Sequence, residues 1–195
     1  MDPNSHVSNA YFQNWGRMFI AGPYSFSFFI FMGGIFMTDE EYMSQALALA
    51  REALEEGEVP VGCVIVWEDG RIVGRGRNRR EGDRDALGHA ELEAIRMACQ
   101  VTGGWRLNRA RLYVTLEPCP MCAGAILNAR IPELHYAAKD PAMGSCGSVL
   151  NLFEERFGSH PRIYRGPLEA ECGRLLSDFF ARTRERGDKT GRRER

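Results

Sequence analysis

The sequence lacks the features that mark several classes of protein. It has no internal repeat and no low-complexity tract, which excludes a solenoid or a fibrous protein. It also lacks a disulfide framework, because four of its six cysteines stand singly in apolar or small-residue contexts, which is typical of buried free thiols in a reducing cytosol. These are Cys63, Cys99, Cys146 and Cys172. Its hydrophobic (44%) and charged (26%) fractions are ordinary and predict one soluble globular domain.

Net charge is also small, at −1, and it is unevenly distributed. From Arg182 to the C-terminus there are seven basic and three acidic residues, whereas residues 37–181 are mildly acidic. This balance favours local contact with phosphates over bulk binding of nucleic acid, and a solvated, frayed tail is the alternative. We predict a folded domain over residues 37–186 and a basic tail over residues 187–195.

The first 36 residues differ from the rest. Residues 18–37 contain no charged side chain and seven Phe or Tyr residues, and their length would allow a membrane span. Glycines, serines and Pro23 interrupt this stretch, and no secretory cleavage site is evident. We therefore expect Met37 to be the true start, with residues 1–36 a translation artefact or a disordered extension. A membrane segment with an inside N-terminus is the alternative.

After Met37 the hydrophobic period alternates between that of helices and that of strands. A capping box at Thr38–Glu41 begins a helix that Gly57 can end. The other expected helices are 89–102, 119–130, a short one within 149–157, and 168–186 with Leu175, Leu176, Phe179 and Phe180 inward; the expected strands are 61–67, 71–76, 111–116, 133–138 and 162–164. Residues 77–88 are expected to form a polar loop. This alternation predicts an α/β layered domain.

Two short motifs carry the chemistry: His89-Ala90-Glu91 and Pro118-Cys119-Pro120-Met121-Cys122. His89, Cys119 and Cys122 match a catalytic zinc site, which has three protein ligands and one position for water. No further Cys or His lies at the spacing of a closed structural site. Both ligand groups are expected at helix N-termini, where free N–H groups favour thiolates. The cysteines alone could be a redox pair or half a structural site; their pairing with His-x-Glu favours hydrolytic zinc chemistry.

The chain from Met37 to Arg186 resembles the bacterial tRNA-specific adenosine deaminases of the cytidine deaminase-like superfamily. The matching stretches are Glu58–Gly62, Asn78, His89–Glu91, Leu112–Cys119, Met121–Ala125, Asp140, Gly147-Ser148 and Leu175–Phe180. This resemblance implies a three-layer α/β/α sandwich with a central mixed five-stranded sheet. It also implies a cytoplasmic homodimer with one zinc ion per subunit, which converts adenosine to inosine at the wobble position (34) of a tRNA anticodon stem-loop, without stable membrane association.

The resemblance also assigns roles to individual residues. Glu91 matches the proton shuttle; because it lies two residues after His89, off the histidine's helical face, it is expected to reach water rather than the metal. The implied substrate-binding residues are Asn78, which orients the base, with Pro60, Val61 and Asp140. The backbone of Leu116 and Glu117 would complete the pocket wall. Arginines near Asn78 could contact phosphates, or could simply be solvated; they are Arg75, Arg77, Arg79, Arg80 and Arg84.

One departure from the family pattern concerns base selectivity. Relatives usually read Asp-Pro-Thr-Ala before the histidine, whereas this chain reads Asp85-Ala86-Leu87-Gly88. A deaminase of a free base or nucleoside, of the guanine or cytosine type, is the alternative enzyme, because the same zinc core serves both. A catalytically silent RNA-binding or scaffold partner is a further alternative, but such a subunit would have no need of Glu91.

Overall fold

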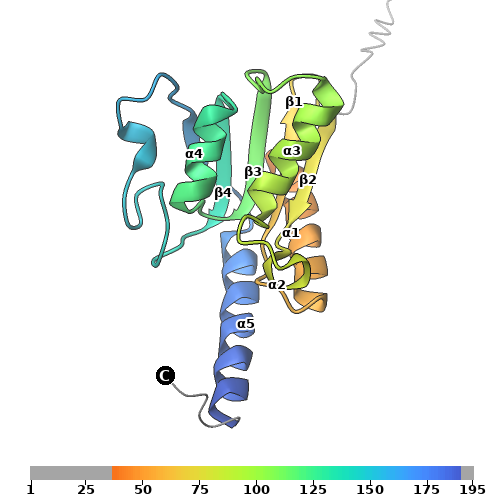
Figure 1. Ribbon diagram of the computed structural model, residues 1–195, viewed down its shortest axis with the longest axis vertical. Coiled ribbons are helices and arrows are strands. Elements are labelled where there is room, and N and C mark those ends of the chain that lie inside the picture. Colours follow the sequence, from red (N-terminus) through yellow and green to blue (C-terminus); the bar gives the residue numbers. More distant parts are fainter. Residues whose placement is uncertain (1–36, 190–195) are drawn as a thin grey trace, which may run out of the picture. The chain divides into compact units, whose positions relative to one another are not determined.

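The computed structural model describes residues 37–189, and the expectations for residues 1–36 and 190–195 lie outside this range (Figure 1). Its centre is a five-stranded sheet in the order β2-β1-β3-β4-β5. The strands are β1 (Gly62–Trp67), β2 (Ile72–Arg77), β3 (Ala110–Leu116), β4 (Glu133–Ala138) and β5 (Arg162–Arg165). β1 runs antiparallel to β2 and β3, whereas β3, β4 and β5 are parallel. The expected mixed sheet is therefore confirmed.

Helices cover both faces of this sheet. They are α1 (Asp39–Glu55), α2 (Arg80–Asp83), α3 (Ala90–Thr102), α4 (Pro120–Asn128) and α5 (Glu169–Lys189). α3 and α4 lie side by side in front of the sheet, with α1 behind it (Figure 1). α5 packs on β3 and β4, and Glu171 on α5 reaches Arg51 on α1 at 4.0 Å. These layers are the expected α/β/α sandwich. No helix within residues 37–189 is long and apolar enough to cross a membrane.

Glycines in the β1–β2 hairpin allow helices to approach both faces closely. A Cβ at Gly62 would lie 2.0 Å from the Ala46 carbonyl oxygen of α1. On the opposite face, a Cβ at Gly76 would lie 2.1 Å from the Ala90 carbonyl oxygen of α3. Both contacts are impossible for a larger residue without moving a helix backbone. The α3 contact places the first turn of α3 against the end of β2, which brings His89 near Asn78.

Behind the sheet, the core contains a row of stacked aromatic rings. Tyr113 lies between Tyr42 and His135, with ring centroids 5.2 and 4.5 Å away, and Tyr164 stacks on the far side of His135 at 4.8 Å. The Tyr113 hydroxyl donates a 2.7 Å hydrogen bond to Asp39 at the start of α1. This row ties α1, β3, β4 and β5 together.

The short helix expected within residues 149–157 is a 3-10 helix (Leu152–Glu154) that follows the isolated β-bridge between Cys146 and Asn151. Two other expectations about local structure were wrong. The loop 77–88 contains the short helix α2, which is held by a distant carboxylate described below. Phe180 is 45% exposed rather than inward, because it follows the part of α5 that buries Cys172 and Leu176 against the core.

Candidate metal centre and active site

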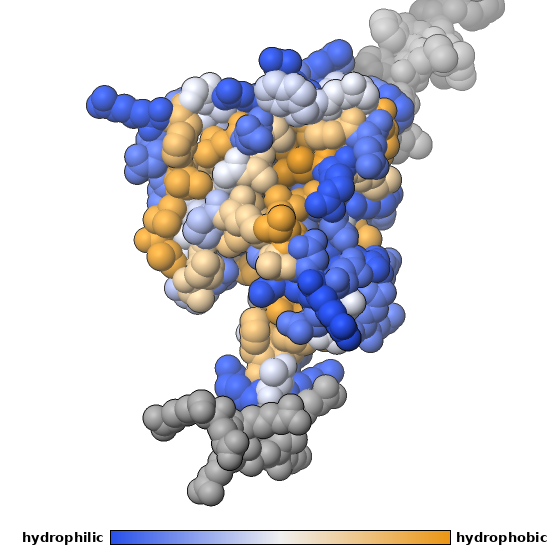
Figure 2. Space-filling model, viewed as in Figure 1, coloured by the Kyte–Doolittle hydropathy of each residue, from blue (hydrophilic) through white to orange (hydrophobic). Residues whose placement is uncertain are grey.

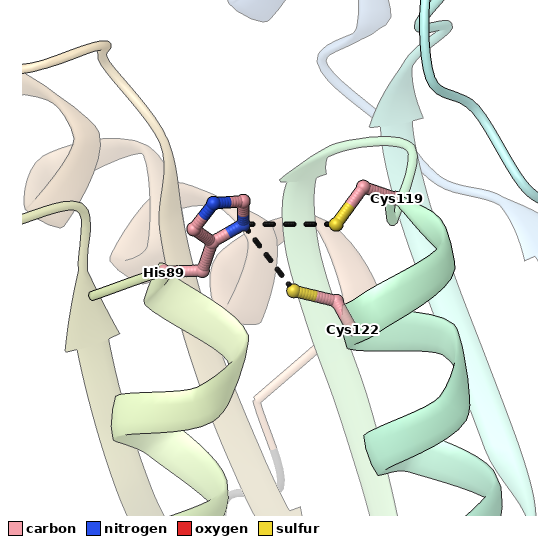
Figure 3. A group of neighbouring side chains, drawn as sticks. All are labelled: His89, Cys119 and Cys122. Carbon is pink, nitrogen blue, oxygen red and sulfur yellow. Dashed lines mark hydrogen bonds between the residues drawn. The ribbon is translucent and has the colours of Figure 1, made fainter. Parts of the chain in front are cut away.

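Three side chains from two helix starts converge in front of the sheet. The ligand atoms of His89, Cys119 and Cys122 all lie within 4.8 Å of one another. His89 Nδ1 is 3.4 Å from the Cys122 sulfur and 3.7 Å from the Cys119 sulfur (Figure 3). Figure 3 shows the imidazole and both thiols pointing toward one another across the gap between α3 and α4. The sequence-predicted ligands are therefore brought together.

Local sequence explains why these residues stand at helix starts. His89 is the N-cap residue of α3 and Cys119 is the N-cap residue of α4, both in extended conformation. Pro120 is at the start of α4, where its missing N–H costs nothing and its fixed φ favours helix initiation. Two helix N-termini thus direct partial positive charge at the same small region, which favours thiolates there.

The protonation of the two thiols differs. A hydrogen bond from the Cys122 thiol, helped by His89, lowers the pKa of Cys119 to about 4. Donating that bond to Cys119, together with burial, raises the pKa of Cys122. Hydrogen bonding to Cys119 also raises the pKa of His89. The lowered pKa of Cys119 favours its thiolate, and a second negative sulfur so close to the first needs a positive partner.

The donor set fits a soft or borderline divalent metal. Two sulfurs and one imidazole nitrogen are the ligand types that zinc prefers, and three protein ligands leave a fourth tetrahedral position open. A divalent cation would also release the protons that these groups otherwise share. Because their ligand atoms already lie within 4.8 Å of one another, these three residues could hold such an ion without a movement of either helix.

Glu91 lies in the first turn of α3 and is only 4% exposed. Burial raises the pKa of its carboxyl, and the hydrogen bond from its own backbone N–H offsets this only in part. A buried carboxyl with a raised pKa close to candidate metal ligands is the usual environment of a group that exchanges protons during catalysis.

The implied substrate-binding residues lie on two sides of the ligand cluster. Asn78 is buried, and its side-chain oxygen accepts a 3.2 Å hydrogen bond from the Ala90 N–H beside His89. Its backbone N–H donates to the Val61 carbonyl at 3.1 Å, and both Val61 and Pro60 are buried. Asp140 follows β4; its Oδ1 accepts the N–H groups of Ala142 and Met143 at 2.9 and 3.1 Å, which shapes the loop after β4.

The altered segment before His89 forms an ordered turn. Asp85 Oδ1 accepts the Leu87 N–H at 2.8 Å, and Gly88 is bonded through its N–H to Asp85 and through its carbonyl to Arg79. A Cβ at Gly88 would have its nearest neighbour at 3.2 Å, a tight contact that an alanine could occupy after a small adjustment. The departure from the family pattern thus leaves a closed loop that delivers His89 to the cluster.

Sequence reasoning did not foresee the role of the Glu117 side chain. This carboxylate is 1% exposed, and three backbone N–H groups and the Ser148 hydroxyl donate to it. Burial alone would raise the pKa of Glu117, but these hydrogen bonds outweigh it and lower the pKa. The sequence offered one signal for this role, which is that Glu117 stands directly between an apolar strand and Pro118-Cys119.

The five arginines near Asn78 are not equivalent. Arg75 contacts Gln45, and Arg77 pairs with Glu52 and Glu56. Arg79 pairs with Asp83 and Glu93. Arg80 and Arg84 are exposed, and neither forms an ion pair within residues 37–189. These two are therefore the arginines of this group best able to meet an added phosphate.

Comparison with known proteins identifies the class. The model of the MafB19-like deaminase family matches residues 37–182, and the chain belongs to this deaminase family. It is therefore an enzyme of the deaminase type.

Its relatives include tRNA-specific enzymes. The tRNA-specific adenosine deaminase of Bacillus subtilis (strain 168) is 46% identical over 149 residues, which cover 76% of this chain and 92% of that protein. A solved structure from a study of A-to-I editing by tRNA:A34 deaminases is 45% identical, with a TM-score of 0.68 over 70% of this chain and 99% of that chain. The guanine deaminase of Bacillus subtilis is 34% identical, with a TM-score of 0.52 over 76% of this chain and 95% of its own. The resemblance to tRNA-specific adenosine deaminases is thus confirmed.

Proposed function

We propose that this protein is a zinc-dependent hydrolase that converts adenosine to inosine at the wobble position (34) of tRNA. The observation that carries this proposal is the convergence of His89, Cys119 and Cys122 beside the buried Glu91. It occurs in a chain that is 46% identical to a tRNA-specific adenosine deaminase and covers 92% of it.

The cofactor is one zinc ion per subunit, held by His89, Cys119 and Cys122. Bound zinc supplies a Lewis acid that makes water nucleophilic at neutral pH. The Glu91 carboxylate takes one proton from the water that attacks C6 of adenine and gives it to the ring nitrogen. It then takes the second proton from the new C6 hydroxyl group and gives it to the amino group, which leaves as ammonia when the C6–N bond breaks. Inosine and ammonia are the products, so no oxidant or reductant is needed.

The base binds between the two loops that border the cluster. The Asn78 oxygen is engaged by Ala90, which leaves the NH₂ of the same amide to pair with a base edge. Buried Pro60 and Val61 form one wall, and Asp140 lies on the other side. An extruded base needs such a narrow, partly apolar pocket with one amide for orientation. Arg80 and Arg84 supply phosphate contacts for the anticodon stem-loop.

The enzyme acts as a cytoplasmic homodimer. Figure 2 shows apolar side chains gathered on the face formed by α3 and α4. Met97 and Val101 on α3 are 40% and 55% exposed. Val149 and Leu150, which lie between β4 and the 3-10 helix, are 55% and 40% exposed. Exposed apolar residues gathered in this way mark association surfaces. Analytical ultracentrifugation should give twice the 22.0 kDa mass of one chain. This mass should stay the same when the protein is diluted to the concentration used in the activity assays.

A deaminase of free guanine is the second candidate, because a guanine deaminase is 34% identical. The deciding experiment offers the full chain, and residues 37–195 alongside it, an anticodon stem-loop with adenosine at the wobble position, and separately free adenosine, guanine and cytosine. Inosine formed only in the stem-loop supports the proposal. Turnover of a free base with an inert stem-loop would overturn it, and turnover of neither would favour the silent RNA-binding partner.

A further inference from the structure

Two loops border the ligand cluster, and each is held by one buried carboxylate. The α2 loop (residues 79–88) leads into His89, and its ends are joined by the hydrogen bond from the Arg79 N–H to the Gly88 carbonyl at 2.9 Å. The β4 loop (residues 139–148) packs on the segment before Cys119, where the Ser145 N–H donates to the Pro118 carbonyl at 2.9 Å.

Glu58 holds the α2 loop from outside. It follows α1 and is 3% exposed, and its Oε1 accepts the backbone N–H groups of Glu81 and Gly82 at 2.9 and 2.8 Å. These N–H groups lie in the first turn of α2, whose own N-cap residue, Arg79, makes no side-chain capping bond. Free N–H groups at a helix start need an acceptor, and here a residue 23 positions away supplies it.

Glu117 holds the β4 loop in the same way. Its Oε1 accepts the N–H groups of Cys146 and Ser148 at 2.7 and 3.1 Å, and its Oε2 accepts the Asp140 N–H at 3.1 Å. The loop is shaped around this carboxylate, because a Cβ on Gly144 would lie 2.5 Å from the Glu117 carboxyl carbon. Asp140, an implied substrate-binding residue, is thus bonded directly to Glu117 through its backbone.

The two carboxylates share an unusual environment. Both are almost fully buried, and within residues 37–189 neither forms an ion pair with Arg or Lys. A buried charge without a cation is costly unless hydrogen-bond donors replace its hydration. The loop N–H groups are those donors, so each loop conformation and its carboxylate stabilise one another.

We propose that Glu58 and Glu117 are positioning residues that set the two walls of the substrate pocket, Glu58 through the α2 loop and Asn78, and Glu117 through the β4 loop and Asp140. This rests on the proposed function for the substrate, but not for the loop geometry. Neither side chain need touch the base. Loosening a loop would weaken substrate positioning while the ligand cluster, which is carried by the two helix starts, stays in place.

The test uses Glu58→Ala and Glu117→Gln in the full, zinc-loaded chain, with Glu55→Ala and Glu55→Gln at an exposed position as the matched controls. Glu58→Ala removes the one oxygen that accepts both the Glu81 and Gly82 N–H groups. In Glu117 both oxygens accept N–H groups, so the NH₂ group of Glu117→Gln replaces one acceptor. Hydrogen exchange measured by NMR should show faster exchange of the Glu81 and Gly82 amides in Glu58→Ala only. In Glu117→Gln it should show faster exchange of the Asp140, Cys146 and Ser148 amides only.

With the stem-loop substrate, each variant should raise KM about tenfold or more, lower kcat less, and keep its zinc content. Gly144→Ala, whose Cβ would crowd both Glu117 and the Asp140 carbonyl oxygen, should loosen the same loop and raise KM in the same way, whereas Gly104→Ala, with open space around it, should not. Loosening of both loops by either variant, loss of zinc, or unchanged KM despite a loosened loop would overturn the proposal. An inert wild-type enzyme would instead overturn the proposed function, and the exchange pattern would still decide whether each carboxylate holds its own loop.

Discussion

His89 and His135 lie in two regions of the same domain and are used in opposite ways. His89 stands at a helix start in front of the sheet, where hydrogen bonding to Cys119 raises its pKa. His135 lies behind the sheet, stacked between Tyr113 and Tyr164, where burial lowers its pKa despite Glu133 at 3.8 Å. The first region gathers side chains that can exchange protons and bind a cation; in the second, burial favours the neutral form of the histidine.

The difference teaches that position, rather than residue type, separates reactive from structural side chains here. Each region contains a histidine and a carboxylate close together. Helix N-termini supply donors and partial positive charge in front of the sheet. Behind the sheet, ring stacking and side-chain packing fill the space, so the same groups serve stability.

The largest expected effect is at the reactive region. Glu91→Gln removes the group that moves protons, so kcat should fall by about 10²- to 10⁴-fold, because general acid–base catalysis is of that size. Zinc content and thermal midpoint should remain, since Glu91 is not among the proposed ligands. Steady-state kinetics with metal analysis measures both, and Glu55→Gln is the control. Normal turnover by Glu91→Gln would refute the assigned role.

Metal removal should come next. When the free metal concentration is about a thousand times its Kd, binding stabilises the folded state by about 4 kcal/mol. For a domain of this size, that corresponds to a shift of the thermal midpoint by roughly 10 °C. Chelation should therefore lower the midpoint of the wild type in differential scanning calorimetry. Cys119→Ser, with a ligand removed, should begin lower and respond little to chelator. An unchanged wild-type midpoint after confirmed zinc loss would show that the cluster does not tie α3 to α4.

A smaller effect is expected behind the sheet. Tyr113→Phe removes the hydrogen bond to Asp39, which should cost about 1 kcal/mol because Asp39 is partly solvated. Denaturant unfolding should detect this loss, while deamination rates stay unchanged. Tyr164→Phe, at an exposed position, is the matched control and should cost less. A loss of activity in Tyr113→Phe would mean that the two regions are coupled.

The smallest effect concerns pH. The folded-state pKa of His135 lies below its ordinary value of 6.5, so as the pH falls through 6.5 the unfolded chain binds a proton that the folded protein does not. The His135 contribution therefore destabilises the fold progressively below that pH, until the lower folded-state pKa is passed. His135→Phe keeps an aromatic ring in the stack and should lose less stability between pH 7 and 5 than the wild type. Equal losses, measured by urea unfolding, would contradict this.

Much of the fold could be predicted because its signals are local. The capping box of Thr38 and Glu41 is present, α4 begins at Pro120, and the five strands lie where periodicity predicted them. The failures were nonlocal. α2 depends on Glu58 from 23 residues away, and Phe180 is exposed because the core packs against the earlier part of α5, at Cys172 and Leu176.

The same division holds for the site. The sequence by itself determined the ligand types and the nearby carboxylate, since His-x-Glu and Cys-x-x-Cys each occupy a few neighbouring residues at helix starts. Only the tertiary structure decided which carboxylates face the site and which hold its walls. Burial raises the pKa of Glu91, whereas Glu117 accepts hydrogen bonds from N–H groups up to 31 residues away. The physical reason is that a side chain's environment depends on what packs around it, and chain spacing does not encode those long-range contacts.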